Sequence, residues 1–169
     1  MTWINNLTPL DWAGLRALRH PCLFQGTITQ MVFSRLRGGQ VYLATPYTEQ
    51  VKTSGEFDEY RSEVAGSVAA RWLLRLNRAD VAAVSPVVMA VAMLREDQER
   101  NLRPLDEGFW AAWCRPMLAA SHAVAVPMVP GWDRSRGIWA EVMIALRALT
   151  AVALIEDQRL EEDEGEADV

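Results

Sequence analysis

The chain has 169 residues, half of them hydrophobic, which is enough for one domain with its own core. Its 17 basic and 22 acidic residues give a net charge of −5, and six of the acids lie in residues 161–169. The rest is nearly neutral and lacks the basic stripe that binds DNA or RNA, which excludes a nucleic acid polymer but not a nucleotide-sized ligand.

Neither long apolar stretch, 81–94 or 116–132, reaches the roughly 20 uninterrupted residues of a membrane span, and prolines interrupt both. The N-terminus (MTWINNLTPLDW) lacks the basic and apolar regions of a secretory signal. We therefore expect a cytoplasmic protein with no membrane partner.

Cys22 and Cys114 form neither a disulfide framework nor a zinc pattern, and the two histidines lie far apart in the sequence. We therefore expect no metal. No GxGxxG or Walker-type loop occurs, so we also expect no cofactor.

Residues 1–40 form an N-terminal extension whose structure is hard to infer. Residues 11–19 (DWAGLRALR) are consistent with a short helix capped by Thr8 or Asp11, and residues 27–33 (TITQMVF) with a strand.

Residues 41–45 (VYLAT) have the composition of a buried parallel strand, which Pro46 ends. Polar residues 48–55 predict a loop. The next segment, from Glu56 to Leu76, predicts an amphipathic helix whose apolar residues recur at three- and four-residue spacing and face the sheet: Phe57, Tyr60, Val64, Val68, Trp72 and Leu76.

Strands and helices continue to alternate in the second half. Residues 81–88 (VAAVSPVV), 123–129 (AVAVPMV) and 150–156 (TAVALIE) predict strands, and residues 89–100, 109–120 and 135–149 predict helices. Pro116 either kinks the second of these helices or starts another. The pattern predicts a single Rossmann-like α/β domain over 41–156, with a mostly parallel sheet of about five strands and helices on both faces. Residues 157–169 predict a disordered acidic tail.

Ligands of such sheets bind beyond the carboxyl ends of the strands, which selects the loops after residues 45, 85 and 129. The third is the most informative. Gly131 permits a turn, Ser135 is able to cap the following helix, and the first N–H groups of that helix form an anion site that Gly137 leaves accessible. Glu141 follows one helical turn later on the same side.

Segments 41–47 (VYLATPY), 84–86 (VSP) and 131–141 (GWDRSRGIWAE) resemble the motifs of a known superfamily. The chain resembles the nucleoside 2-deoxyribosyltransferase-like superfamily over roughly residues 40–156, and its DUF1937 branch most closely. In that superfamily, the glutamate at the position of Glu141 attacks C1′ of a nucleoside or nucleotide and forms a glycosyl ester. Tyr42 matches the tyrosine that orients it, although a core aromatic residue would give the same pattern.

The resemblance also implies a ligand. Ser135 matches the serine of the superfamily's 5′-monophosphate hydrolases, and a hydroxyl at a helix N-terminus suits a phosphate. Ser85 would form a pocket wall. Further candidates are arginines that would contact the phosphate and aromatic rings that would stack on the base. Exposed arginines are also explained by solvation, and the rings by packing. The phosphate partners are Arg61, Arg134 and Arg136, and the rings are Tyr47 and Trp132.

Two acids that the superfamily usually carries are absent here, because their positions fall at Cys114 and His122. A shift in alignment would instead place Asp106 or Glu107 there. We therefore expect either an N-glycosidase or deoxyribosyltransferase-like enzyme, or a non-catalytic nucleotide-binding module of the same fold. A purely structural subunit is a third alternative. Superfamily members commonly form homodimers, so we expect one here.

Overall fold

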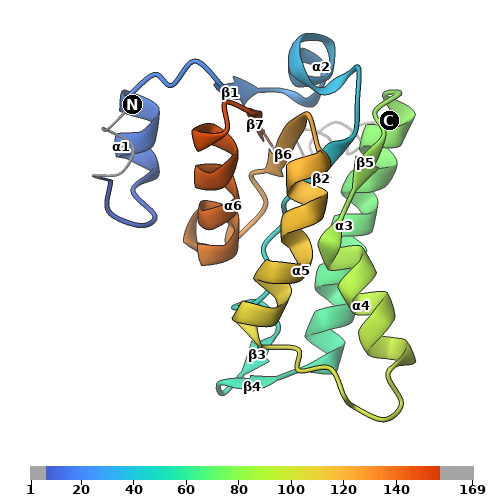
Figure 1. Ribbon diagram of the computed structural model, residues 1–169. Coiled ribbons are helices and arrows are strands. Elements are labelled where there is room, and N and C mark those ends of the chain that lie inside the picture. Colours follow the sequence, from blue (N-terminus) through green and yellow to red (C-terminus); the bar gives the residue numbers. More distant parts are fainter. Residues whose placement is uncertain (1–6, 157–169) are drawn as a thin grey trace, which may run out of the picture.

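Within residues 7–156, which are those that the computed structural model describes, five parallel strands form the central sheet (Figure 1). Their order across the sheet is β1-β7-β6-β2-β5. The prediction of an α/β domain with a parallel sheet is confirmed. The strands are β1 (Leu23–Gly26), β2 (Val41–Leu43), β5 (Ala83–Val84), β6 (Ala123–Pro127) and β7 (Ala151–Ile155).

Helices cover both faces of this sheet. On one face lie α1 (Trp12–Ala17), α5 (Glu107–Ala120) and α6 (Arg136–Arg147), and on the other α2 (Ile28–Met31), η2 (Val32–Leu36) and α3 (Glu59–Arg78). Helix α4 (Pro86–Glu96) packs on α3 (Figure 1). The remaining elements are a small hairpin, β3 (Lys52–Thr53) with β4 (Glu56–Phe57), and the 3₁₀ turn η3 (Trp132–Arg134).

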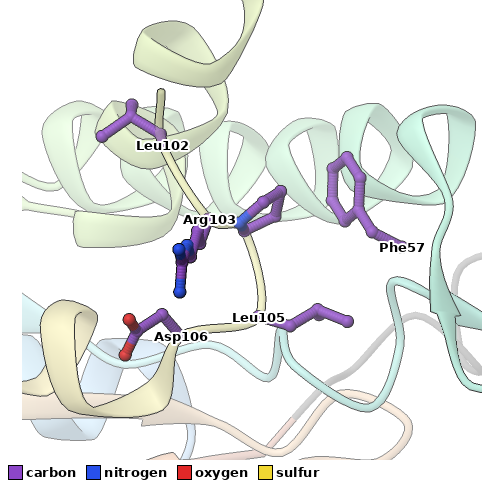
Figure 2. Close-up of a pocket in the computed structure, with 6 residues that line it drawn as sticks. Phe57, Leu102, Arg103, Leu105 and Asp106 are labelled. Carbon is purple, nitrogen blue, oxygen red and sulfur yellow. The ribbon is translucent and has the colours of Figure 1, made fainter. Parts of the chain in front are cut away.

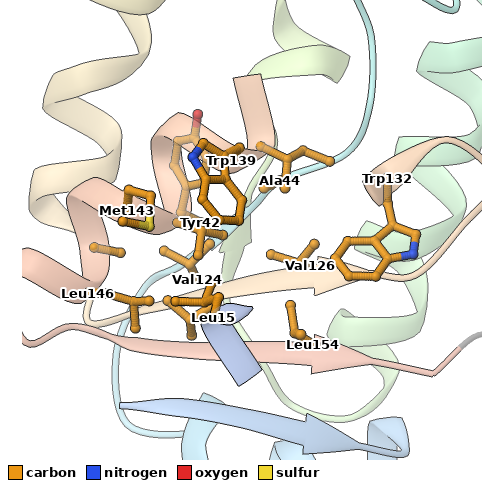
Figure 3. Packing of buried hydrophobic residues seen from close by; sticks show 14 of the residues in the cluster. Leu15, Tyr42, Ala44, Val124, Val126, Trp132, Trp139, Met143, Leu146 and Leu154 are labelled. Carbon is orange, nitrogen blue, oxygen red and sulfur yellow. The ribbon is translucent and has the colours of Figure 1, made fainter. Parts of the chain in front are cut away.

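The alternation of side chains along each strand divides the core into two layers. Tyr42, Val124 and Val126 point toward α1, α5 and α6, and Figure 3 shows them packed with residues of α1 and α6. Leu43 and Ala125 point to the opposite face, toward α3 and η2. Both layers are apolar because the sheet is buried on both sides, which explains the near-continuous hydrophobic runs of its strands.

The N-terminal prediction is partly wrong. Residues 27–33 do not form a strand: Thr27 and Gln30 form a reciprocal capping box that starts α2. The strand of this region is β1, whose residues pair with β7 at the edge of the sheet. Helix α1 forms as expected, and Asp11 is its cap, with its carboxylate accepting a hydrogen bond from Gly14 N.

Helix α3 is present but begins at Glu59, so Phe57 lies in β4 and not on the helix, and the buried face of the helix is displaced. Tyr60 and Val64, which the pattern directs toward the sheet, are 78% and 46% exposed. Small residues are buried instead, because α4 crosses α3 closely: a Cβ on Gly66 would lie 3.1 Å from the side chain of Val91. The buried residues of α3 are Ser62, Ala65, Gly66, Ala69, Trp72 and Leu76.

Two further boundaries differ from expectation, and the structure decides between the two alternatives for Pro116. Strand β5 has only two residues, because Ser85 caps α4 and Pro86 occupies its first turn, where proline is well tolerated. The predicted loop 48–55 contains β3. Pro116 lies inside a continuous α5 and does not start a new helix. The acidic tail lies outside the described residues.

Strand order reverses between β2 and β6. The chain passes from β2 to the edge strand β5, then crosses over β2 to β6 and continues to β7. The carboxyl ends of β2 and β6 therefore flank the crevice in which open α/β sheets bind ligands. Within residues 7–156, no helix is both long and apolar enough to cross a membrane.

Candidate active site

A hydrogen bond between Tyr42 and Glu141 lies at the centre of the candidate site. The hydroxyl of Tyr42, in β2, donates to Oε1 of Glu141, in α6, over 2.5 Å. The two residues are 99 positions apart in the sequence and meet because α6 returns along the face of the sheet to which Tyr42 points. The structure thus brings together the two residues that the motifs single out.

Burial changes the protonation of this pair. Desolvation raises the pKa of Glu141 to about 7, even though the hydrogen bond from Tyr42 opposes the shift. Burial is also the main cause that raises the pKa of Tyr42, followed by the negative charge of Glu141. Tyr42 thus stays a neutral donor, whereas Glu141 is poised between its acid and carboxylate forms near neutral pH. Such poising is typical of catalytic carboxyl groups.

Cys114, in α5, completes the cluster. Its partly buried thiol packs against the core layer that contains Tyr42, close enough for the charge of Glu141 to act on it. Burial raises the thiol pKa to about 11, so Cys114 is uncharged at neutral pH and is a poor nucleophile. Cys114 therefore contacts the Tyr42–Glu141 pair, whereas Asp106 only caps the start of α5, two turns earlier.

His122 lies elsewhere. Its Nδ1 is 2.9 Å from the carbonyl oxygen of Gln40, at the amino end of β6, opposite the end at which β2 leads to the candidate site.

The turn before α6 has the expected form. Gly131 has φ +88°, which only glycine adopts without strain, and Ser135 caps α6 by accepting a hydrogen bond from Ile138 N at 3.3 Å. Gly137 is exposed in the first turn of α6. The first N–H groups of this 12-residue helix and the Ser135 hydroxyl form one polar surface near Glu141.

The candidate arginines differ in position. Arg136 is the first residue of α6 and Arg134 belongs to η3; both are exposed beside Ser135. Arg61 lies in the first turn of α3, where its Nε is 3.9 Å from Oδ2 of Asp58. Arg134 and Arg136 therefore flank the polar surface, and Arg61 does not.

The remaining candidates are held by protein contacts. The hydroxyls of Tyr47 and Ser62 are 2.8 Å apart, which directs Tyr47 toward α3, and Ser85 is buried as the cap of α4. Trp132 is 9% exposed and packs against Trp12, with ring centroids 4.6 Å apart, so its ring is not open to a base.

Sequence reasoning missed three residues near the site. Trp12 donates its indole N–H to the carbonyl of Asp133 over 2.7 Å, and the amide of Gln50 donates to the carbonyl of Pro130 over 2.6 Å. Thr45, at the carboxyl end of β2, is 7% exposed. Its Oγ1 is the buried side-chain oxygen that lacks a hydrogen-bond partner among residues 7–156. Only Thr45 lies inside a motif, so only it had a local signal.

Replacing Thr45 by valine is expected to leave the free energy of unfolding unchanged or raise it by about 1 kcal/mol, because valine has nearly the same shape and removes an uncompensated buried hydroxyl. Urea denaturation checks this, with Thr45→Ser as the variant that keeps the hydroxyl. A loss above about 1 kcal/mol in Thr45→Val alone would show that the hydroxyl is satisfied within the folded protein.

A pocket of about 470 Å³ lies near the start of α5 (Figure 2). It is lined by Phe57, from β4, and by residues 102–106, from the connection between α4 and α5. The pocket shares no residue with the Tyr42–Glu141–Cys114 cluster. The part of the chain described here also holds no group of three or more His, Cys, Asp or Glu side chains arranged to bind a metal.

Comparisons with known proteins agree with the motifs. The family model described as "Domain of unknown function (DUF1937)" matches residues 39–157, which include Tyr42, Cys114 and Glu141. Comparison with curated proteins and with solved structures found no significant match. The match covers most of the chain and ends one residue after the last described position. The protein therefore belongs to the DUF1937 family.

Proposed function

We propose that the protein cleaves the N-glycosidic bond of a nucleoside 5′-monophosphate, with Glu141 as the nucleophile. One carboxylate oxygen of Glu141 attacks C1′, the bond between C1′ and the base nitrogen breaks, and the base leaves with the electron pair and takes up a proton from water. Water then hydrolyses the glycosyl ester, or a second base accepts the sugar, which regenerates Glu141.

The observation that carries this proposal is the 2.5 Å hydrogen bond between Tyr42 and Glu141 beside the N-terminus of α6. The bond holds one carboxylate oxygen in place and leaves the other for reaction. The phosphate would lie on the N–H groups of the first turn of α6, with the Ser135 hydroxyl as a donor and Arg136 at its edge.

Incubation with a panel of ribo- and deoxyribonucleoside 5′-monophosphates, followed by chromatography for free base, tests the proposal. Release from one or more members of the panel is expected. The matching nucleosides without phosphate should be poorer substrates, because they lack the group that α6 would bind. Absence of base from every member would contradict the proposal.

Gly137 allows a test of the phosphate site that spares the fold. A Cβ at this position would meet only Ser135 Oγ, at an ordinary contact distance of 3.8 Å. Gly137→Ala is therefore expected to keep or slightly raise stability, by up to about 1 kcal/mol, because alanine favours helix. The added methyl would hinder approach to the backbone and weaken binding of the monophosphate about tenfold, as measured by calorimetry.

Gly108→Ala is the matched control, because Gly108 is also the second residue of its helix and a Cβ there would meet only Asp106 Oδ1, at 3.5 Å. This variant should bind like wild type. If Gly137→Ala binds the monophosphate as tightly as wild type, α6 does not form the phosphate site.

A second candidate function, nucleotide binding without cleavage, is favoured by Cys114. An uncharged thiol contacts Tyr42 at the position where the resembling superfamily carries an acid, and a thiol of raised pKa is a poor proton donor or acceptor for a departing base. In this case Glu141 would hold ribose hydroxyls. Calorimetric binding of a monophosphate with no base released over prolonged incubation would favour this function.

We also propose that the protein is a cytoplasmic homodimer. The support for the dimer is the surface of α5, where the exposed Phe109 and the partly buried Trp110 and Trp113 form an edge-to-face series with ring centroids 4.9 and 5.5 Å apart. Only Leu118 is fully buried in this apolar helix. Sedimentation equilibrium of wild type and of Phe109→Asp would test this surface.

A further inference from the structure

We propose that the N-terminal segment outside the family region forms part of the candidate site, with Trp12 positioning the turn from Gly131 to Ser135. Trp12 is 5% exposed and lies in α1, which precedes the matched residues 39–157. This proposal deepens the proposed function and rests on it for the identity of the ligand. Its structural part can be tested without any ligand.

Trp12 holds the turn in two ways. Its indole N–H donates to the carbonyl of Asp133, in the middle of η3, over 2.7 Å. Its ring packs edge-on against Trp139, in the first turns of α6, with centroids 4.9 Å apart, and also contacts Trp132. The residue therefore contacts both the turn and the helix that the turn precedes, and Figure 3 shows the two partner tryptophans in the same core layer.

The turn depends on such outside contacts because its own bonds are few and long. Within η3, Arg134 N donates to the carbonyl of Gly131 and Ser135 N to that of Trp132, each over 3.3 Å. Trp132 N also donates to the carbonyl of Val129 over 3.1 Å, and two shorter bonds come from distant residues: the amide of Gln50 donates to the carbonyl of Pro130, and the indole of Trp12 donates to that of Asp133. The residue before the turn and the middle of the turn are thus held by other elements.

Trp12 is itself firmly placed. Leu15, one turn further along α1, is fully buried in the same core layer, and β1, which follows α1, pairs with β7 through four residues. The N-terminal segment is therefore part of the sheet and its core. A rigid support of this kind matters at a reaction centre, because a displacement of about 1 Å is able to lower a rate about a hundredfold.

Trp12→Phe keeps an aromatic ring in the core and removes the bond to Asp133. Amide hydrogen exchange is expected to become about tenfold faster at positions 132–139, which corresponds to one lost hydrogen bond, with little change in α3. The Michaelis constant for the monophosphate that wild type cleaves is expected to rise five- to tenfold, with a smaller change in kcat. Trp110→Phe is the matched control, because the Trp110 indole N–H also donates to a backbone carbonyl, that of Arg103, over 3.0 Å.

The outcomes separate the two proposals. Unchanged amide exchange at 132–139 in Trp12→Phe would overturn the role of Trp12, because the turn would not depend on it. An equal increase in exchange throughout the protein would also overturn it, because Trp12 would then contribute only to general stability. If exchange rises locally but wild type neither binds nor cleaves any monophosphate in the panel, the positioning role stands and the proposed function fails. If binding exists and Trp12→Phe binds as tightly as wild type, the turn is positioned but is not part of the ligand site, and the proposal is overturned.

Discussion

Replacing Glu141 by glutamine is expected to lower the release of base from a nucleoside 5′-monophosphate by on the order of 10³-fold or more. The amide oxygen still accepts the hydrogen bond from Tyr42, so the geometry of the pair is kept, but an amide is not a nucleophile. Base release followed by chromatography under single-turnover conditions measures the chemical step directly. Monophosphate binding should change by less than tenfold, because the phosphate would lie on the first turn of α6 and not on Glu141.

Glu107→Gln is the matched control, since Glu107 is an exposed glutamate in the first turn of α5. It should react at the wild-type rate. The pH dependence of the reaction tests whether Glu141 acts as the nucleophile. A nucleophile must be ionised, so the rate should rise with pH through about 7, where burial places the pKa of Glu141. A rate that falls over this range, or a Glu141→Gln variant that keeps a tenth of the activity, would contradict the nucleophilic role.

The same carboxyl group is expected to make the stability of the protein fall as the pH rises. The pKa of Glu141 is about 7 in the folded protein and near its ordinary value of 4.5 in the unfolded chain. Between these values the folded state binds more protons, so the free energy of unfolding decreases with rising pH. The loss from pH 5 to pH 8 should be about 2 kcal/mol, below the full value of the shift because the side chain is partly exposed.

Urea denaturation of wild type and Glu141→Gln at pH 5 and pH 8 measures this effect as a difference. The contributions of all other groups cancel between the two proteins. The stability advantage of the variant over wild type should be about 2 kcal/mol larger at pH 8 than at pH 5. Parallel stability curves for the two proteins would mean that Glu141 is not desolvated in the folded state.

Local sequence patterns predict the type of a secondary-structure element where packing and capping do not override them. Apolar spacing predicts a helix over 56–76, and a helix forms over 59–78. Its buried face differs from the prediction, because the close approach of Val91 buries the small residue Gly66 and leaves the larger Tyr60 and Val64 exposed. Likewise, residues 27–33 are β-rich in composition, but the capping box of Thr27 starts a helix. Packing and capping thus overrode composition in both cases.

The sequence by itself determined the parallel α/β fold and the candidate residues Ser135, Gly137 and Glu141, because strand hydrophobicity, helix caps and glycine turns act over a few residues. Tyr42 is a candidate only through its resemblance to a superfamily motif. Only the tertiary structure decided which of these groups meet. Tyr42 reaches Glu141 across 99 positions and Trp12 reaches Asp133 across 121, and no local pattern encodes contacts at such separations. The raised pKa of Glu141 has the same origin, since desolvation arises only when the sheet and its covering helices enclose the carboxyl group.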